Sequence, residues 1–232
     1  MLLEIIIAVL ALLITSFLLN FYRDPKRTIP KGNNIVSPAD GRVIRIFDTS
    51  EIVREIKFSA LNQNRRAISE RSQKSLIFET SKDKIEVSKG MIGKIKTTAK
   101  GVSEECYVIS IFMSPLDAHI NRAPIAGKII SIKHTKGKFF KAYDLEKSFE
   151  NEKNEIVIEN KNIKVKVIQI AGFLARRIIC DVKLHQKVNK GGKIGMIALG
   201  SQATIIIPKK INLKIKINDK VKAGESIIAD LK

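Results

Sequence analysis

The segment from Ile197 to Pro208, IALGSQATIIIP, places a Gly-Ser pair between two strongly β-forming runs. Small residues in such a setting are typical of a bulge or a tight turn. The same alternation of short apolar runs and turn residues continues along most of the chain. Strands spaced about eight to twelve residues apart predict an all-β sandwich or barrel. The segment also raises the question of whether Gly200-Ser201 only punctuates the chain or whether Ser201 is reactive.

Further runs show the apolar content or the two-residue alternation expected of strands. They are YVISIFM (107–113), GKIISIKH (127–134), EIVIEN (155–160), IKVKVIQIAG (163–172), RRIICDVKL (176–184), KIGMIAL (193–199), ATIIIP (203–208) and INLKIKI (211–217). Weak echoes between Gly-rich hairpins favour an architecture like that of biotinyl and lipoyl carrier domains. We therefore expect a mainly β fold, with a β domain that resembles a barrel-sandwich hybrid.

Other segments carry weaker signals. SPADG (37–41) is a turn signal between two apolar runs and predicts a β-hairpin. The polar stretch 49–89 contains NQNRRAISERSQK (62–74), which predicts an exposed loop or a short helix. FFKAYDLEKSFENEKNE (139–155) predicts one or two helical turns. Two prolines and a glycine in RDPKRTIPKGNN (23–34) predict a linker without regular structure.

The N-terminal segment from Leu2 to Leu19, LLEIIIAVLALLITSFLL, carries a single charge and lies at the short end of what spans a bilayer as a helix. It lacks the basic start and the small-residue cleavage site of a secretory signal. The basic flank RDPKR that follows keeps the next segment in the cytoplasm by the positive-inside rule. We expect residues 1–22 to anchor the protein to the cell membrane, with the domain on the cytoplasmic side. A monotopic helix lying in the interface is the alternative.

The formal net charge of +19 over 232 residues predicts attraction to a polyanion. A basic domain beside an anionic membrane accounts for this charge without nucleic acid. The sequence also has no aromatic-interleaved basic motif of the kind that binds single strands, so we expect no nucleic-acid partner. A proteome-wide excess of lysine, in which the lysines only solvate the surface, is the alternative explanation.

The cysteine and histidine patterns indicate neither a disulfide framework nor a metal site. Cys106 and Cys180 are far apart and form no CxxC pair, so we expect reduced packing residues, with one disulfide as the alternative. The three histidines form no HxH or HExxH pair, and we expect no metal.

The segment FMSPLDAHINRAP (112–124) concentrates polar side chains directly after an expected strand. Asp117 and His119 are two residues apart, so they project to the same side of an extended backbone. An aspartate beside a histidine can orient the imidazole and stabilise its charged form. The alternative is a polar loop with a surface histidine.

Three further polar residues are candidates on weaker grounds. Asp40, before Gly41 in SPADG, suits ordinary turn chemistry. Arg176 and Arg177 alternate, so one of them points to each face of a strand. Either one of the arginines faces an anionic ligand or both are solvated.

Taken together and in this order, seven blocks resemble the signature blocks of the phosphatidylserine decarboxylase family. The likeness is strongest to its short form, which includes archaeal enzymes that act on archaetidylserine. The blocks are RDPKRTIP (23–30), SPADG (37–41), FMSPLDAHINRAPIAG (112–127), GKFFKA (137–142), ENEKNE (150–155), QIAGFLARRI (169–178) and GKIGMIALGS (192–201). The tail with KAGESI (222–227) continues the likeness, which implies one decarboxylase domain over residues 35–232.

The resemblance implies an answer for the Gly-Ser pair. The Gly200-Ser201 bond is expected to cleave itself, which converts Ser201 into a covalent pyruvoyl cofactor and pairs a large chain, 1–200, with a small chain, 201–232. The substrate implied is an anionic serine phospholipid in the membrane, either phosphatidylserine or archaetidylserine. Its decarboxylation gives the ethanolamine lipid. A homodimer is also implied.

The same resemblance assigns roles to the candidate residues. His119 is implied to be the base in self-cleavage and the proton donor in decarboxylation. Asp40 and Asp117 both match family positions, and either one could orient it. Arg176 and Arg177 are candidates for binding the substrate.

This chain departs from the family pattern at two positions, and two alternatives to the enzyme stay open. Gln202 stands where many members have threonine, and Arg122 stands where some have a second histidine. One alternative is a non-enzymatic membrane-anchored adaptor with a biotinyl- or lipoyl-like domain. The other is an inactive family member that binds anionic lipid.

Overall fold

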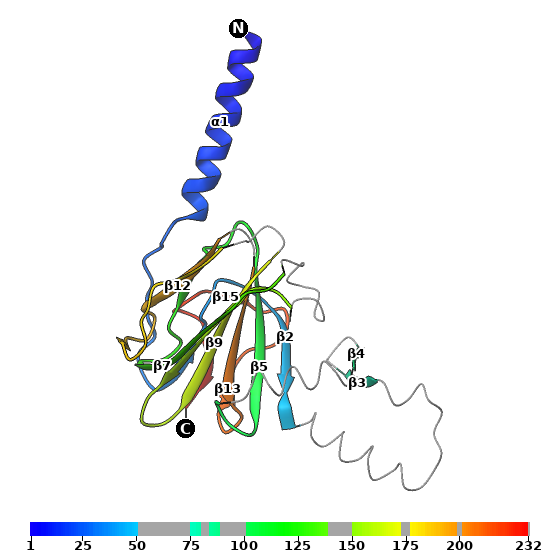
Figure 1. The fold of residues 1–232 in the computed structure, drawn as a ribbon, viewed down its shortest axis with the longest axis vertical. Coiled ribbons are helices and arrows are strands. Elements are labelled where there is room, and N and C mark those ends of the chain that lie inside the picture. Colours follow the sequence, from blue (N-terminus) through cyan, green and yellow to red (C-terminus); the bar gives the residue numbers. More distant parts are fainter. Residues whose placement is uncertain are drawn as a thin grey trace.

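The computed structural model describes residues 1–50, 75–79, 84–88, 101–138, 150–172, 177–198 and 201–231 (Figure 1). Its elements, in chain order, are α1 (Leu2–Phe21), β1 (Asn34–Val36), β2 (Gly41–Asp48), β3 (Ser75–Glu79), β4 (Lys84–Ser88), β5 (Cys106–Met113), β6 (Ile120–Arg122), β7 (Gly127–Thr135), β8 (Lys153–Glu159), β9 (Lys164–Ala171), β10 (Arg177–Cys180), β11 (Lys187–Val188), β12 (Lys193–Ala198), β13 (Ser201–Pro208), β14 (Asn212–Leu213), β15 (Lys220–Val221) and β16 (Ile227–Asp230). The mainly β class with an N-terminal apolar helix is confirmed.

The strands form one large curled sheet and smaller sheets packed beside it. The large sheet has the order β11-β7-β8-β9-β13-β5-β2-β15, and its neighbours are antiparallel. Two three-stranded sheets have the orders β1-β16-β14 and β10-β12-β6. Figure 1 shows β9, β13 and β5 side by side in the middle of the domain. The two free thiols, buried Cys106 and exposed Cys180, agree with the expectation of reduced cysteines.

Strand β13 is central because both of its faces are buried. Ala203, Ile205 and Ile207 are fully buried in the main hydrophobic core. On the opposite face, the Nε2 group of buried Gln202 donates hydrogen bonds to Ser110 and Thr204, at 3.2 and 3.0 Å. A strand buried on both faces needs a nearly continuous apolar run. This explains ATIIIP, where strict alternation would have indicated a half-exposed strand.

The hairpin predicted at SPADG is wrong. The strands on either side of this turn belong to different sheets, because β1 pairs with β16 whereas β2 pairs with β5 and β15. Gly41 has φ of +143°, and a Cβ atom at this position would clash with the carbonyl oxygen of Phe112. The turn signal was correct, but a local signal does not specify which strands pair across it.

Two segments with weak signals fall largely outside the described residues. Most of the polar stretch 49–89 and most of the segment 139–155 lie there, so the expected loop and helical turns stay predictions. Where the chain is described again, it enters β8 at Lys153. The backbones of β3 and β4 pair as an antiparallel two-stranded sheet.

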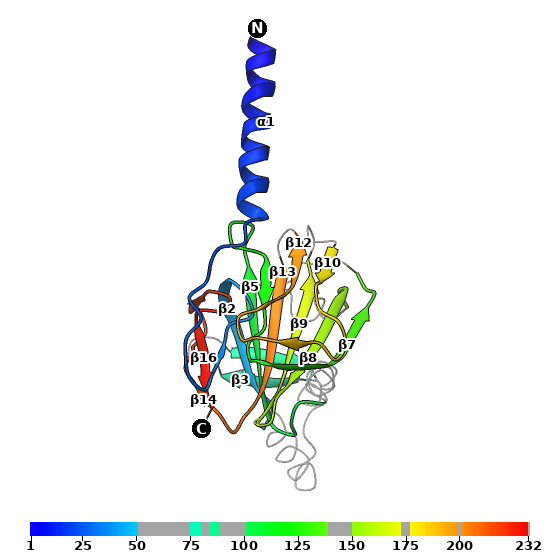
Figure 2. The same cartoon turned by 90° about the vertical axis from the view of Figure 1, so that its left-hand side faces the viewer.

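Helix α1 stands away from the β domain (Figure 2). It is the one helix among the described residues that is long and apolar enough to cross a membrane, with mean hydropathy 2.8. Its side chains are exposed over almost the whole length, and Phe21 at its end is buried. Helix α1 is therefore a candidate membrane anchor. Its base lies at the end of the domain opposite to the C-terminus (Figure 2).

Substitution of Gly41 by alanine should destabilise the protein much more than the same change at Gly101. Both glycines have positive φ, but a Cβ atom at Gly101 would meet open space. We expect Gly101→Ala to cost about 1–2 kcal/mol from backbone strain. Gly41→Ala should exceed the ~3 kcal/mol of a typical damaging substitution, because a backbone clash adds to the strain. Urea unfolding of both variants in detergent, followed by circular dichroism, measures the difference; equal midpoints would contradict this account of Gly41.

Candidate active site

The Gly-Ser pair lies where the chain passes from one sheet to another. Strand β12 ends at Ala198 in the sheet β10-β12-β6, and β13 begins at Ser201 in the large sheet. The backbone of Ser201 lies opposite Met113 of β5 and Ala171 of β9. Residues 199 and 200 and the side chain of Ser201 are outside the described part of the chain. The described strands before and after the pair therefore belong to different sheets.

His119 lies at the same end of the large sheet. It follows the loop that leaves β5 after Met113 and directly precedes β6. The backbone N–H of Ile197, on β12, donates to the His119 carbonyl at 3.3 Å. Ser201 is paired with the last residue of β5, and His119 is bonded to the strand that leads into Gly200-Ser201. The fold thus brings the backbone of Ser201 and His119 to the same end of the large sheet.

The imidazole of His119 is fully buried. Its Nδ1 lies 2.8 Å from the backbone carbonyl oxygen of Asp117. A carbonyl can only accept, so Nδ1 carries the proton and the basic lone pair of the neutral ring is on Nε2. Burial lowers the pKa of His119 below its ordinary value and outweighs the hydrogen bond and charge of Asp117, which raise it. His119 is therefore held as a neutral base.

Asp117 acts on His119 through its backbone, while its carboxylate closes the loop. Oδ2 of Asp117 accepts hydrogen bonds from the backbone N–H and the hydroxyl of Ser114, at 2.8 and 2.7 Å. The N–H of Asp117 in turn donates to the Ser114 carbonyl at 3.0 Å. This tight turn sets the direction of the Asp117 carbonyl, and through it the orientation of the imidazole.

The carboxylate of Asp40 joins two distant segments to the SPADG turn. It accepts two hydrogen bonds from Nη2 of Arg27, at 2.8 and 2.7 Å, and one from the N–H of Ala223 at 2.7 Å. The Arg27 and Asp40 side chains are 7% and 12% exposed. The turn also contacts the strand after His119, because the N–H of Arg122 donates to the Pro38 carbonyl at 2.9 Å. Asp40 therefore links the SPADG turn to Arg27 and to Ala223. Its negative charge also favours the charged form of His119 through a coulombic interaction.

The predicted substrate-binding arginines are only partly described. Arg176 lies outside the described residues. Arg177 begins β10 and is exposed, and its backbone lies opposite Ala198 at the end of β12. Arg177 thus starts its strand beside the segment that leads to Gly200-Ser201. A role in binding substrate stays a prediction for both arginines.

Sequence reasoning singled out the polar segment that holds Asn121 but missed its buried amide partners, Gln169 and Asn154. Nε2 of Gln169 donates to Oδ1 of Asn121 at 2.9 Å, and Nδ2 of Asn154 donates to Oε1 of Gln169 at 2.9 Å. All three side chains are at most 2% exposed. This row of amides links β6, which carries Asn121 two residues after His119, to β9 and β8. The signal was present, since each amide occupies a position of a strand that faces the core.

Phe21 was also missed as a site residue. Its ring lies on the imidazole of His119, with centroids 4.0 Å apart and an interplanar angle of 34°. No sequence signal distinguished it from the other apolar residues of the expected anchor, because the contact spans 98 residues of chain.

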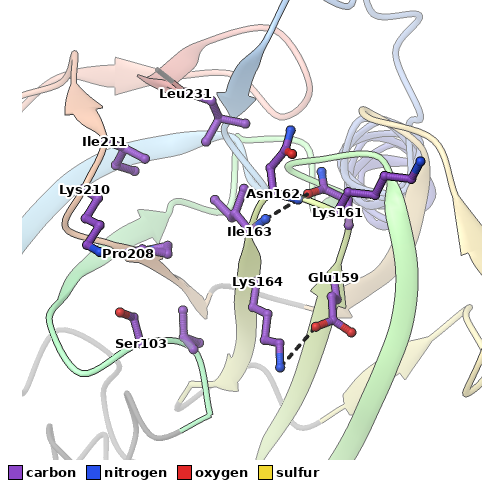
Figure 3. Close-up of a pocket in the computed structure, with 12 residues that line it drawn as sticks. Ser103, Glu159, Lys161, Asn162, Ile163, Lys164, Pro208, Lys210, Ile211 and Leu231 are labelled. Atoms are coloured by element: carbon purple, nitrogen blue, oxygen red, sulfur yellow. Dashed lines mark hydrogen bonds and ion pairs between the residues drawn. The ribbon is translucent and has the colours of Figure 1, made fainter.

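A cavity of about 510 Å³ lies at the other end of the large sheet (Figure 3). It is lined by residues 102–103, 159–164, 208, 210, 211 and 231. Pro208 is the last residue of β13, whereas Ser201 is its first. Figure 3 shows the ion pair of Glu159 with Lys164 at its edge, with an N–O distance of 3.1 Å. The length of β13 therefore separates this cavity from His119 and Ser201.

Comparisons with known proteins match nearly the whole chain to one family. The model of the phosphatidylserine decarboxylase family matches residues 14–229. A protein of Methanocaldococcus jannaschii named as an archaetidylserine decarboxylase proenzyme is 42% identical over 230 residues, covering 96% of this chain and 93% of its own. The phosphatidylserine decarboxylase proenzyme of Prosthecochloris aestuarii is 34% identical over 232 residues, covering 99% and 84% of the two chains. The mainly β fold and these relatives agree, and the chain belongs to the phosphatidylserine decarboxylase family.

Proposed function

We propose that this decarboxylase acts on a serine phospholipid, phosphatidylserine or archaetidylserine, after it has cut its own backbone between Gly200 and Ser201. The product is the ethanolamine lipid. The observation that carries the proposal is the fully buried His119, oriented by Asp117, at the end of the sheet where Ser201 begins β13. Family membership supplies the decarboxylase activity and the phospholipid class of the substrate. It also argues against the adaptor alternative.

Self-cleavage begins at the hydroxyl of Ser201. Its Oγ attacks the carbonyl carbon of Gly200, the amide nitrogen leaves as an amine, and the peptide bond becomes an ester. A base then removes the Cα proton of residue 201, and the ester oxygen departs with Gly200 as a carboxylate. Water converts the dehydroalanine so formed into a ketone and releases ammonia. The sequence consumes one water and needs no oxidant or reductant.

His119 is the proposed base in these steps. A serine hydroxyl is a weak nucleophile unless a neighbouring base accepts its proton. The Nδ1–H tautomer set by the Asp117 carbonyl directs the basic position, Nε2, away from that carbonyl. Because burial lowers the pKa of His119, the ring stays neutral and able to accept a proton near neutral pH. Asp117 and Asp40 are proposed as the residues that orient and support it.

The start of β13 suits a pyruvoyl group better than an ordinary amino terminus. Gln202, the next residue, is 3% exposed, and the Ser201 backbone is paired on both sides. A charged α-amino group at this position would lose its hydration, which costs several kcal/mol for a buried ion. A pyruvoyl group carries no charge at this position. The surroundings therefore favour a blocked small chain.

The small chain would stay bound to the large chain after cleavage. Strand β13 pairs along its full length with β5 and over residues 201–206 with β9, both in the proposed large chain. Strands β15 and β16 pair with β2 and β1. These ladders and the core between them hold residues 201–232 without a covalent link. A homodimer stays a prediction.

In the decarboxylation itself, the pyruvoyl ketone would supply the electron sink that accepts the electrons left by departing carbon dioxide. The protein orients the substrate, excludes water and delivers a proton. We propose that His119 returns a proton to the carbon that has lost carbon dioxide. Arg176 and Arg177 are proposed to bind the anionic headgroup.

The candidate anchor α1 would keep the enzyme at its substrate. Residues 1–22 are proposed to attach the protein to the cell membrane, and residues 35–232 to form the decarboxylase domain on the cytoplasmic side. The basic residues of the flank 23–27 support this orientation.

Replacing Ser201 by alanine should leave one uncut chain without decarboxylase activity, because the attacking hydroxyl is lost. Intact mass spectrometry of the purified protein measures this. The unaltered protein should show two chains, with the smaller one blocked by pyruvate. Ser131→Ala, at an exposed position of β7, is the matched control and should be cut normally. Normal cleavage of Ser201→Ala would refute the pyruvoyl assignment, and an unaltered protein that stays whole would favour the inactive lipid-binding alternative.

Self-cleavage should depend on pH with an acid limb below pH 6.5, the ordinary value for histidine. The neutral ring is the active form, and its lowered pKa keeps it neutral to lower pH than an exposed histidine. Precursor made by cell-free translation can be moved to buffers between about pH 5 and 8, with cleavage followed by denaturing electrophoresis. His119→Ala should not cleave, whereas His134→Ala, at a half-exposed site, should retain the profile of the unaltered protein. Full cleavage of His119→Ala would remove it from the mechanism.

Deleting residues 1–20 should release the domain from membranes, because the deletion removes almost all of the apolar helix. Fractionation of cell extracts, with a high-salt wash to remove proteins held only by charge, measures the attachment. A truncated protein that stays in the washed membrane fraction would show that α1 is not the main attachment.

A further inference from the structure

The end of the membrane helix is built into the site. Within α1, whose residues are all described, Phe21 is the buried one, at 0% exposed, while Leu19 two residues earlier is 72% exposed. The Phe21 ring lies on the imidazole of His119, with centroids 4.0 Å apart. A helix that served only as a tether would not need to pack a side chain against His119, the proposed base.

Phe21 also contacts both strands that flank the histidine. It forms a hydrophobic cluster with Ile120, the residue after His119, and with Met196 of β12. Met196 directly precedes Ile197, whose N–H donates to the His119 carbonyl. Phe17, one turn earlier in α1, packs against Phe21 with centroids 5.9 Å apart and against the same cluster. The last turn of the helix therefore covers the imidazole from one side.

Polar contacts fix the helix end relative to the loop that carries His119. Nη2 of Arg23 donates to the carbonyl of Leu116 at 3.0 Å, and Arg122 pairs with Asp24. These two contacts hold the chain after α1 to the loop before His119 and to the strand after it. The contact of Phe21 with the imidazole is thus supported by one polar contact to the chain before His119 and one to the chain after it.

We infer that Phe21 is a positioning residue for His119, so that the membrane helix forms one wall of the catalytic site. The Asp117 carbonyl holds the imidazole at Nδ1, and the Phe21 ring confines its face. Together they leave the imidazole one orientation. This inference rests on the proposed function only in taking His119 as the base.

The arrangement has a consequence for where the reaction occurs. A helix of 20 residues is about 30 Å long, the thickness of the hydrocarbon core of a bilayer. If α1 spans the bilayer, its last residue, Phe21, lies at the membrane surface. His119 then also lies at the membrane surface, because its imidazole is in contact with the Phe21 ring. The serine headgroup of a membrane lipid is at the same depth. The substrate can therefore reach the base without leaving the bilayer.

Removing the Phe21 ring should alter the titration of His119. The charged groups that act on the imidazole are Asp117 from its own loop, Arg23 from the segment after α1 and Asp40 from the SPADG turn, and a substitution of Phe21 leaves all three in place. Water that enters beside the ring would favour the charged form. Phe21→Ala should therefore raise the pKa of His119 and move the acid limb of self-cleavage to higher pH.

The test uses the full-length protein in lipid nanodiscs. In a Ser201→Ala background, which keeps the chain uncut, NMR of ¹³C-labelled histidine follows His119, one of three histidines. In the otherwise unaltered protein, the same Phe21 variants are assayed for self-cleavage against pH. Phe21→Ala should cleave about tenfold or more slowly than the unaltered protein at neutral pH, because the base is no longer held in place. Phe21→Leu keeps an apolar cover over the imidazole. It should therefore cleave at nearly the rate of the unaltered protein, and the pKa of its His119 should lie close to that of the unaltered protein.

Leu19→Ala is the matched control, since it removes an apolar residue from the same helix end without a contact to His119. It should leave the titration, the cleavage and the membrane attachment unchanged. If Phe21→Ala does not fold, Phe21→Val, which covers less of the imidazole face than Phe21→Leu, takes its place and is compared with Leu19→Ala, and a measurable shift in its titration alone supports the inference. A His119 titration in Phe21→Ala, or in Phe21→Val where that variant replaces it, that is the same as in the unaltered protein overturns the inference. If the titration shifts but the pH dependence of cleavage does not follow, the packing inference holds and the assignment of His119 as the base fails.

Discussion

The pairing of β13 on both sides is the constraint on which the site depends. Because β5 and β9 hold its backbone in register from Ser201 onward, the first residue of β13 has a defined position at one end of the large sheet. The chain that leaves β5 at this end turns back and carries His119. The chain that enters β13 arrives from β12, which is bonded to His119. Backbone pairing alone thus assembles residues that are 82 positions apart.

A second set of contacts ties the N-terminal segment to the domain. Residues 23–33 have no regular structure, yet Arg27 pairs with Asp40, and Glu225 accepts a hydrogen bond from the N–H of Thr28 at 3.0 Å. The Arg27–Asp40 pair is nearly buried, so removal of Arg27 would leave the Asp40 carboxylate without its charged partner, whereas Arg27 also pairs with Glu225. These contacts connect α1 to the site rather than to a distant surface. They make the placement of α1 part of the geometry of the candidate catalytic residues.

The candidate site was partly predictable, and the missing part has a common physical cause. The strand runs, the apolar N-terminal helix and the polar loop around His119 follow from local patterns, and the resemblance of seven blocks identified the family. Phe21, Gln169 and Asn154 were missed because each acts through a contact with a residue far away in the chain. The same limit explains the error at SPADG, where the turn was recognised but its two strands join different sheets. Asp40 and Asp117 were both candidates to orient His119, and in the structure its ring contacts the backbone carbonyl of Asp117.

The sequence by itself determined the mainly β class, the apolar N-terminal helix and the family, because periodicity, hydropathy and ordered motifs are all properties of neighbouring residues. Only the tertiary structure decided that the end of the helix covers His119 and that Arg27 and the N–H of Ala223 donate hydrogen bonds to Asp40. It also decided that the His119 imidazole is fully buried, which lowers its pKa. Burial and orientation depend on which distant segments meet. A local sequence pattern does not specify these long-range contacts, whereas the packing of the strands and the helix does.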